Sequence, residues 1–93
     1  MATVTRRPTT AVTAVETVLH ITANSVDEND TDGSELRYYM TIEKSGQDTL
    51  RSQIFNGDWT WDGVIIPATG TWTAHLRKVA DDSSIANLSI VAS

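Results

Sequence analysis

The closing stretch PATGTWTAHLRKVADDSSIANLSIVAS, residues 67–93, decides the fold of this 93-residue chain. Apolar and polar side chains alternate over residues 71–77, which is the period-two pattern of a strand with one buried face. Residues 81–84 form a polar turn signal, and Leu88 and Ile90 then resume the alternation. The stretch therefore predicts the last two strands of a β-sandwich, with the end of the domain close to the end of the chain.

The segments that precede this strand pair carry the same kind of pattern. An edge strand is expected near residues 10–14, and a second strand follows from Val15, with residues 15, 17, 19 and 21 on one face. Residues 25–35 are acidic and rich in turn-forming residues, which predicts a surface loop with Val26 as an isolated apolar residue. Residues 36–43 form the clearest amphipathic strand.

Two turn signals divide the middle of the chain. Lys44-Ser45-Gly46-Gln47 predicts a hairpin into a partner strand over about residues 48–55. Asn56-Gly57 predicts a second hairpin, because both residues tolerate a positive φ, and it leads into a strand over residues 59–66. The count is about seven short antiparallel strands without a helical period, which is the pattern of a sandwich; an open barrel is the alternative.

Composition limits the classes of function. Seven basic against twelve acidic side chains give a net charge of −5, which argues against binding to nucleic acid and against an anionic membrane surface. The chain has no cysteine, so its stability must come from packing. We find neither a secretory leader nor an apolar run long enough for membrane insertion. With Met1 as the natural start, we expect a protein that is made and kept in the cytosol.

The length predicts a single domain. We expect residues 1–10 to form an extended N-terminal arm and residues 11–93 to form the sandwich, because Arg6, Arg7 and Pro8 interrupt any regular pattern. A basic arm ahead of an acidic body could reach onto an acidic neighbour, which makes Arg6, Arg7 and Pro8 candidate docking residues. The alternative is an ordinary disordered terminus.

The phrase IPATGTWTAHL, the polar turn after it and the closing IANLSIVAS together resemble the immunoglobulin-like domain families of bacteria and phages. The resemblance covers the chain from about residue 10 to its end. It implies an all-β immunoglobulin-like β-sandwich in which Trp72 lies near the place of a tyrosine and Tyr38 takes the place of the core tryptophan. It also implies a noncatalytic module for adhesion, surface display or virion decoration.

The same resemblance implies which residues replace the disulfide of antibody domains. Leu19, with Ala74 or Leu76, fills the positions that hold the paired cysteines there.

Metal binding and catalysis find little support in the sequence. Glu28, Asp30 and Asp32 approximate the opening of a calcium loop, but Tyr39 stands where the closing bidentate glutamate is needed, so a solvated acidic loop is the favoured interpretation. His20 and His75, the two histidines, are expected on strand surfaces. No cofactor is expected.

Nothing local activates a hydroxyl, because no G-x-S-x-G elbow occurs. Asp58 and Asp62 flank two tryptophans, but their spacing gives no sign of the desolvated acid that glycoside cleavage requires. We therefore expect no enzymatic activity.

Three tryptophans form the most informative aromatic cluster. Trp59 and Trp61 share one face of a strand, and Trp72 leads the next strand, so all three fit a common buried face. Core packing is the favoured interpretation. The alternative is an indole platform that stacks on sugar rings, with Trp59 and Trp61 as the glycan contact.

These observations together predict a noncatalytic structural protein of a phage virion. The most direct role is a head decoration protein that docks on the major capsid protein or another virion protein, after assembly in the host cytoplasm. A homo-oligomer is compatible with this role. The alternatives are a carbohydrate-binding or adhesion module and a tail accessory protein.

Overall fold

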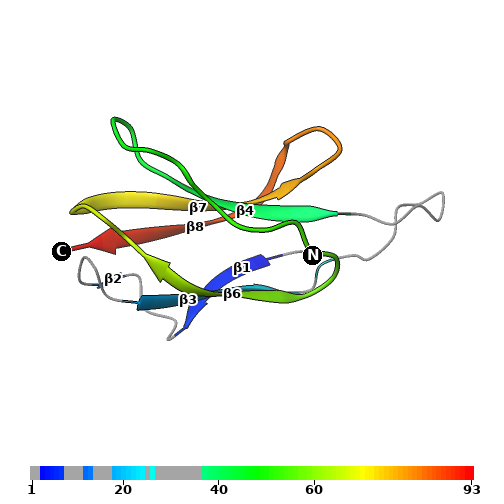
Figure 1. Ribbon diagram of the computed structural model, residues 1–93, viewed down its shortest axis with the longest axis horizontal. Coiled ribbons are helices and arrows are strands. Elements are labelled where there is room, and N and C mark those ends of the chain that lie inside the picture. The colour runs from blue at the N-terminus through cyan, green and yellow to red at the C-terminus, as the bar shows by residue number, and fades with distance from the viewer. Residues whose placement is uncertain (1–2, 8–11, 14–17, 25, 27–36) are drawn as a thin grey trace.

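The computed structural model of the protein describes residues 3–7, 12–13, 18–24, 26 and 37–93, and for residues 6, 7, 12 and 13 it describes the backbone alone. The described residues form two β-sheets that lie face to face (Figure 1). The smaller sheet has the order β1 (Thr3–Arg7), β3 (Val18–Asn24), β6 (Trp59–Ile65). The larger sheet has the order β2 (Val12–Thr13), β8 (Ser84–Ala92), β7 (Gly70–Lys78), β4 (Tyr38–Glu43), β5 (Leu50–Arg51).

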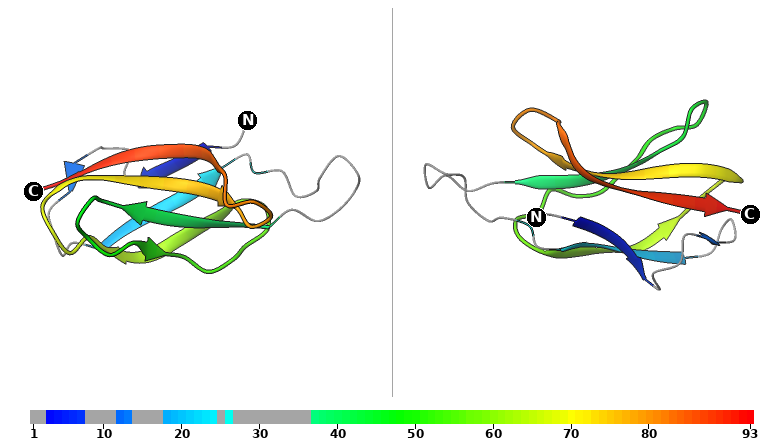
Figure 2. Two further views of the ribbon diagram at one scale, coloured as in Figure 1. Left: turned by 90° about the horizontal axis from the view of Figure 1, so that it is seen from above. Right: turned by 180° about the vertical axis from the view of Figure 1, so that it is seen from behind.

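The division of the strands between the two sheets resembles that of immunoglobulin-like sandwiches. In those domains the C, F and G strands share one sheet while the A and B strands and the E strand lie in the other. Here β4, β7 and β8 divide from β1, β3 and β6 in the same way (Figure 2). Neighbouring strands pair antiparallel, except for a short parallel pairing of β2 with β8.

The prediction of an all-β sandwich is confirmed. The described residues contain eight strands where about seven were expected. β2 and β5 are two residues long, and a segment of two residues shows no alternation that a sequence pattern could reveal.

The core lies between the inner faces of the two sheets. Trp72, Ala74 and Leu76 of β7 are fully buried, as the alternation in the closing stretch predicts. Leu19 is also buried and belongs to the other sheet, so side chains from both sheets contribute to one apolar core. The other large side chains that are fully buried are Tyr38, Ile21, Met40, Ile42, Ile66 and Ile90.

Trp72 fixes the corner between β6 and β7. Its indole is completely buried, and the Nε1–H group donates a hydrogen bond of 3.0 Å to the carbonyl oxygen of Ala68. In immunoglobulin-like domains a tyrosine near the start of the F strand makes a comparable bond back to the backbone a few residues upstream. Trp72 stands near the start of β7 and makes this bond with an indole, so the largest core side chain also satisfies a polar group of the corner.

The turn after β4 forms where the sequence predicts it. The backbone N–H of Gln47 donates to the carbonyl of Lys44 at 3.0 Å, and Gly46 has a φ of +82°. A turn with positive φ at its third position favours glycine there. The partner strand is much shorter than the expected residues 48–55, because only Leu50–Arg51 pairs with β4 as a strand.

Ser52 ends this short strand by replacing a ladder bond. Its hydroxyl accepts a hydrogen bond of 2.8 Å from the N–H of Met40 and donates one of 2.8 Å to the carbonyl of Gln53. Phe55 then resumes pairing with Tyr38 through two backbone bonds of 2.8 Å. The segment therefore runs beside β4 as an edge strand whose pairing is interrupted. The alternation of apolar and polar residues does not reveal this interruption and predicts one continuous strand.

Asn56-Gly57 does not form a hairpin, so this prediction is wrong. Gly57 adopts the expected positive φ of +72°, but β5 before it lies in the larger sheet and β6 after it lies in the smaller sheet. Asparagine and glycine favour this backbone conformation both in a hairpin turn within one sheet and in a connection that crosses between two sheets. Long-range pairing decides which of the two forms.

Part of the expected N-terminal arm belongs to the sandwich. Residues Thr3–Arg7 form β1 and pair with β3 along their whole length, and Val4 is buried in the core. The boundary expected at residue 10 therefore does not separate these residues from the domain. Val4 and the threonines on either side of it alternate between apolar and polar, as in a strand. The pattern is too short to predict β1, because the two arginines that follow interrupt it.

Candidate functional site

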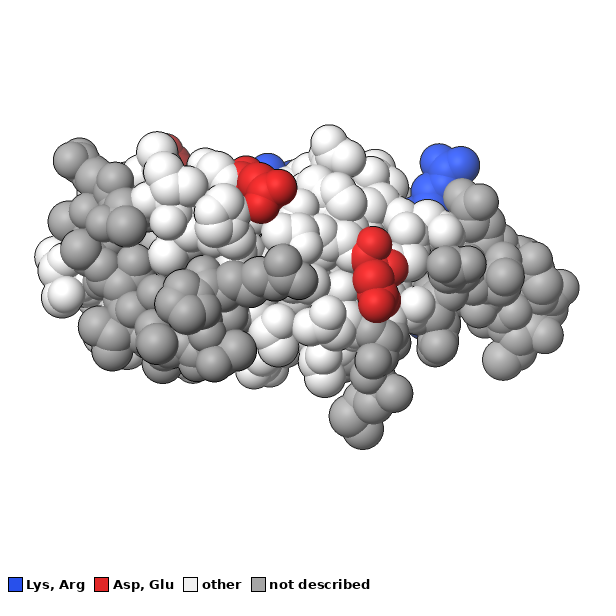
Figure 3. Space-filling view, turned by 90° about the horizontal axis from the view of Figure 1, so that it is seen from below, with Lys and Arg blue, Asp and Glu red and all other residues white. Residues whose placement is uncertain are grey.

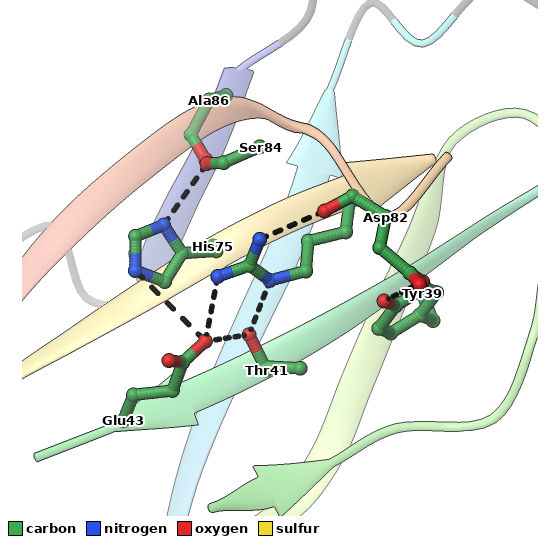
Figure 4. A network of polar contacts seen from close by, with 8 residues as sticks. Tyr39, Thr41, Glu43, His75, Asp82, Ser84 and Ala86 are labelled. Carbon is green, nitrogen blue, oxygen red and sulfur yellow. Dashed lines mark hydrogen bonds and ion pairs between the residues drawn. The ribbon is translucent and has the colours of Figure 1, made fainter. Parts of the chain in front are cut away.

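A network of polar side chains covers the outer face of the larger sheet (Figure 4). The outer-face network consists of Tyr39, Thr41, Glu43, His75, Arg77, Asp82 and Ser84. Residues that face each other across antiparallel strands share a face of the sheet, and here Tyr39 is opposite Arg77 while Thr41 is opposite His75. The register of β4 and β7 therefore brings these side chains together.

Arg77 connects the parts of the network. Its Nη2 lies 2.9 Å from a carboxylate oxygen of Glu43, and its Nε donates to the hydroxyl of Thr41 at 3.2 Å. Its Nη1 donates to the backbone carbonyl of Asp82 at 2.9 Å, which ties the turn after β7 to the sheet. The guanidinium thus satisfies three acceptors and holds two strands and a turn in one arrangement.

Tyr39 is buried although it lies on the outer face of its sheet. Its hydroxyl donates to the carboxylate of Asp82, and the guanidinium carbon of Arg51 lies 4.1 Å from the centre of its ring. The hydrogen bond to Asp82, followed by burial, raises the pKa of Tyr39. The folded protein therefore favours the neutral phenol. The stabilisation from this group is fully present at pH values below the pKa of Tyr39 in the unfolded chain, and it is lost as the pH rises through the pKa of Tyr39 in the folded protein.

The free energy of unfolding is expected to decrease as the pH falls below about 4.3, partly because Glu43 becomes protonated. Hydrogen bonds from Thr41 and then from Arg77 hold the pKa of Glu43 below its ordinary value. A carboxyl whose pKa is lowered by folding stabilises the protein above the unfolded pKa, and this contribution is lost as the pH falls through the folded pKa. Glu43→Gln should remove this contribution to the free energy of unfolding. The contribution is at most about 1 kcal/mol, because the Glu43 side chain is 36% exposed.

Urea unfolding at pH 7 and at pH 3 measures this effect. Asp48→Asn is the matched control, because Asp48 is exposed and lies outside the network. The pH dependence should flatten in Glu43→Gln and stay unchanged in Asp48→Asn. An equal change in both variants would contradict the role assigned to Glu43.

Ser84, His75 and Glu43 lie in a line on the outer face, an arrangement that the sequence did not reveal. His75 Nδ1 lies 2.9 Å from Ser84 Oγ, but His75 Nε2 is 4.0 Å from Glu43 Oε2. The carboxylate is already engaged by Arg77 and Thr41, so it does not orient the imidazole as a catalytic triad requires. The line of residues stands on a sheet face whose backbone amides are paired in the ladder, so they offer no oxyanion hole.

The outer face of the smaller sheet differs from that of the larger sheet in charge. We call it the threonine face, and its described side chains are Thr3, Thr5, Val18, His20, Thr22, Asn24, Thr60, Asp62 and Ile65. In the view from below, the described atoms of this side are mainly white, with acidic residues among them (Figure 3). Of its described side chains, Asp62 is the one that carries a full charge at neutral pH, and His20 Nδ1 lies 2.6 Å from its carboxylate.

Hydrogen bonds between side chains hold the threonine face in order. The hydroxyls of Thr22 and Thr60 lie 3.0 Å apart across β3 and β6. The amide of Asn24 donates to the hydroxyl of Thr5 at 2.9 Å, which links β3 to β1. The face is therefore ordered across all three strands before anything binds to it.

Val18 and Ile65 add an exposed apolar pair to the threonine face. They are direct partners across β3 and β6, and they are 51% and 48% exposed. Low charge combined with exposed apolar side chains is typical of the centre of a protein interface. The sequence does not reveal this pair, because Ile65 lies 47 positions from Val18 and only the register joins the two.

The two candidate glycan contacts, Trp59 and Trp61, lie on the inner side of β6. They are opposite Ala23 and Ile21, which are both fully buried, and they pack partly buried against the core. Trp59 also stacks on Phe55, with ring centres 4.9 Å apart. This arrangement favours core packing over a flat platform for sugar rings.

A hollow of about 320 Å³ is lined by Arg37, Ile54, Phe55 and Asn56. Its volume is at the low end of the range for ligand sites. Arg37 is the one titratable side chain among these four, so they do not supply an acid and a base together.

The remaining sequence candidates are located as follows. Arg6 and Arg7 lie on β1 by their backbone, whereas Pro8 lies outside the described residues. The calcium-loop candidates Glu28, Asp30 and Asp32 also lie outside the described residues. In the part of the chain that is described, we find no group of three histidine, cysteine, aspartate or glutamate residues that could hold a metal ion.

Among the described residues there is no helix of the length and apolarity needed to cross a membrane. Comparisons of the chain with models of protein families, with curated proteins and with solved structures found no match.

Proposed function

We propose that the protein is a noncatalytic structural component of a phage virion, a head decoration protein that docks on the capsid surface through its threonine face. The observation that carries the proposal is the low charge of the described side chains of this face in a chain of net charge −5, together with the exposed pair Val18 and Ile65. Burying such a face costs little desolvation of charge and removes apolar surface from water.

The hydrogen bonds within the threonine face also favour docking. Its hydroxyl and amide groups are hydrogen-bonded to one another, so fewer side chains lose conformational freedom when a partner binds. The outer-face network lies on the opposite sheet and carries paired charges, which would keep the free side of a docked domain soluble. β1 is one of the strands that form the threonine face, and its last two residues are Arg6 and Arg7, so a contact of this basic pair with an acidic part of the same partner belongs to the proposal.

The resemblance to immunoglobulin-like domains of bacteria and phages supports the virion as the assembly. The threonine face supports docking on a protein surface more than contact with sugars, because Trp59 and Trp61 lie on the inner side of β6. The line of Ser84, His75 and Glu43 gives no ground for a hydrolase, because the glutamate is engaged elsewhere.

We expect Val18→Lys/Ile65→Lys to lower the affinity for capsids about a hundredfold, because it replaces the exposed apolar pair by two charges that docking would have to desolvate. The measurement is cosedimentation of the purified protein with capsids assembled without it. Val79→Lys/Val91→Lys is the matched control, since Val79 and Val91 are comparably exposed but belong to the larger sheet and its turn.

The control should bind like the unchanged protein. Failure of the unchanged protein to bind capsids would contradict the decoration role. Binding to tails lacking the protein, with the same sensitivity to Val18→Lys/Ile65→Lys, would instead identify a tail accessory protein. Equal losses in both double variants would show that the threonine face is not the docking surface.

A further inference from the structure

The smaller sheet ends in an open edge. Among the residues that the structure describes, β6 pairs with β3 on one side and with no strand on the other. Figure 2, left, shows β6 along the lateral margin of the smaller sheet, beneath β4 and β5. In an antiparallel edge strand, alternate N–H and C=O groups point away from the sheet and can pair with a further strand.

A bulge limits the regular part of this edge to its first half. Between the pairs Leu19↔Val64 and Ile21↔Trp61, β6 has one residue more than β3, and Gly63 adopts a φ of +77° there. A bulge twists and interrupts an edge, so continuous pairing is available over Trp59-Thr60-Trp61. Two carboxylates bracket this segment, Asp58 before it and Asp62 after it.

The side chains of the segment specify what could pair with it. Trp59 and Trp61 are partly buried on the inner side, so each leaves indole surface for an apolar side chain of an added strand. Thr60 points to the outer side, where its hydroxyl meets that of Thr22 at 3.0 Å. Asp62 lies on the side of Thr60, two residues away, and its carboxylate is 2.6 Å from His20 Nδ1. Asp58 precedes the strand, and its carboxylate accepts a hydrogen bond of 2.9 Å from the N–H of Val26.

We infer that the β6 edge binds an extended basic segment of a partner protein by strand addition. The complementary pattern is basic, apolar, polar, apolar, basic, with the two basic residues opposite Asp58 and Asp62 and the apolar ones against the indoles. Asp58 and Asp62 are both exposed, so their carboxylates can accept further charged donors. A second copy of β6 is disfavoured as the partner, because antiparallel self-pairing centred on this strand would bring carboxylates together.

This inference extends the proposed docking role by naming a second way in which a partner is held, but its test does not depend on a virion. The probe is the peptide acetyl-Lys-Val-Thr-Val-Lys-amide, with acetyl-Glu-Val-Thr-Val-Glu-amide as the charge-reversed control. Hydrogen exchange followed by NMR reports which backbone amides the peptide protects. We expect millimolar lysine peptide to slow the exchange of outward-pointing amides within residues 59–61, and the glutamate peptide to leave them unchanged.

Substitutions at the edge separate this site from general charge effects. Asp62→Lys should weaken binding of the lysine peptide about fivefold, because it turns an attraction into a repulsion. Asp48→Lys makes the same charge change at an exposed position near the larger sheet and should leave binding unchanged. Asp62→Asn keeps an acceptor for His20 and should give an intermediate loss.

Three results would overturn the inference. The lysine peptide could protect no amide of residues 59–61, or Asp48→Lys could weaken binding as much as Asp62→Lys. Concentration-dependent protection of the same amides without any peptide would identify a second copy as the occupant. Loss of capsid binding through Val18→Lys/Ile65→Lys tests the docking role separately, so either proposal can fail while the other stands.

Discussion

Trp72→Ala is expected to lower the free energy of unfolding by about 4 kcal/mol. The indole is fully buried between the sheets, and its removal leaves a cavity that the surrounding strands cannot fill. The carbonyl of Ala68 also loses its hydrogen-bond donor. Small domains have about 5 to 15 kcal/mol of stability, so the variant should be close to unfolding, with a midpoint about 20 °C lower in thermal denaturation.

Two controls separate the parts of this effect. Trp72→Phe keeps most of the apolar volume but not the N–H donor, and we expect it to cost about 2 kcal/mol. Val91→Ala removes methyl groups from an exposed side chain and should change the stability by less than about 0.5 kcal/mol. Urea unfolding followed by circular dichroism measures all three variants. A loss below about 1 kcal/mol in Trp72→Ala would show that the corner does not depend on the indole.

Gly70→Ala should cost about 2 kcal/mol because of its backbone conformation. Gly70 opens β7 with a φ of +125°, in a region that side chains with a Cβ rarely adopt. A Cβ at this position would also contact the end of the Lys44 side chain, which reaches over from the turn after β4. Lys44 is flexible and can move away at little cost, so the backbone should account for most of the loss.

Lys44→Ala/Gly70→Ala tests this division of causes. If the backbone conformation dominates, removing the Lys44 side chain will not restore the stability lost in Gly70→Ala. Gly46→Ala is the matched control at another glycine with positive φ, where nothing lies within 4 Å of the added Cβ, and we expect a loss of about 1 kcal/mol. Full recovery in the double variant would show that the contact with Lys44, and not the φ of Gly70, is responsible.

The parts of the fold that depend on neighbouring residues could be predicted from the sequence. The alternation around Trp72 predicts β7 and its buried face, and the glycine of the turn after β4 adopts the expected positive φ. Asn56-Gly57 shows the limit of this reasoning. Its backbone conformation is as expected, but whether the next strand joins the same sheet depends on β3, which lies far away in the chain.

The candidate site was harder to predict for the same reason. Val18 and Ile65 become one apolar pair only through the register of β3 with β6. Tyr39 belongs to the polar side of an amphipathic strand by pattern, yet it is buried, because Asp82 and Arg51 close over it from other segments. Arg77 gave no signal at all in the sequence, since its role depends on three acceptors that the fold brings together.

The paired strands also differ in how far apart they lie in the chain, and this influences the order in which they assemble. His75 and Ser84 meet across the β7–β8 hairpin at a separation of 9 positions, whereas Thr22 and Thr60 meet across β3 and β6 at a separation of 38. Local hairpins close within microseconds, and distant pairings are slower because a longer loop must be ordered first. We therefore expect the β7–β8 hairpin to form before β3 pairs with β6, so that the chain gains its docking surface only after this hairpin has closed.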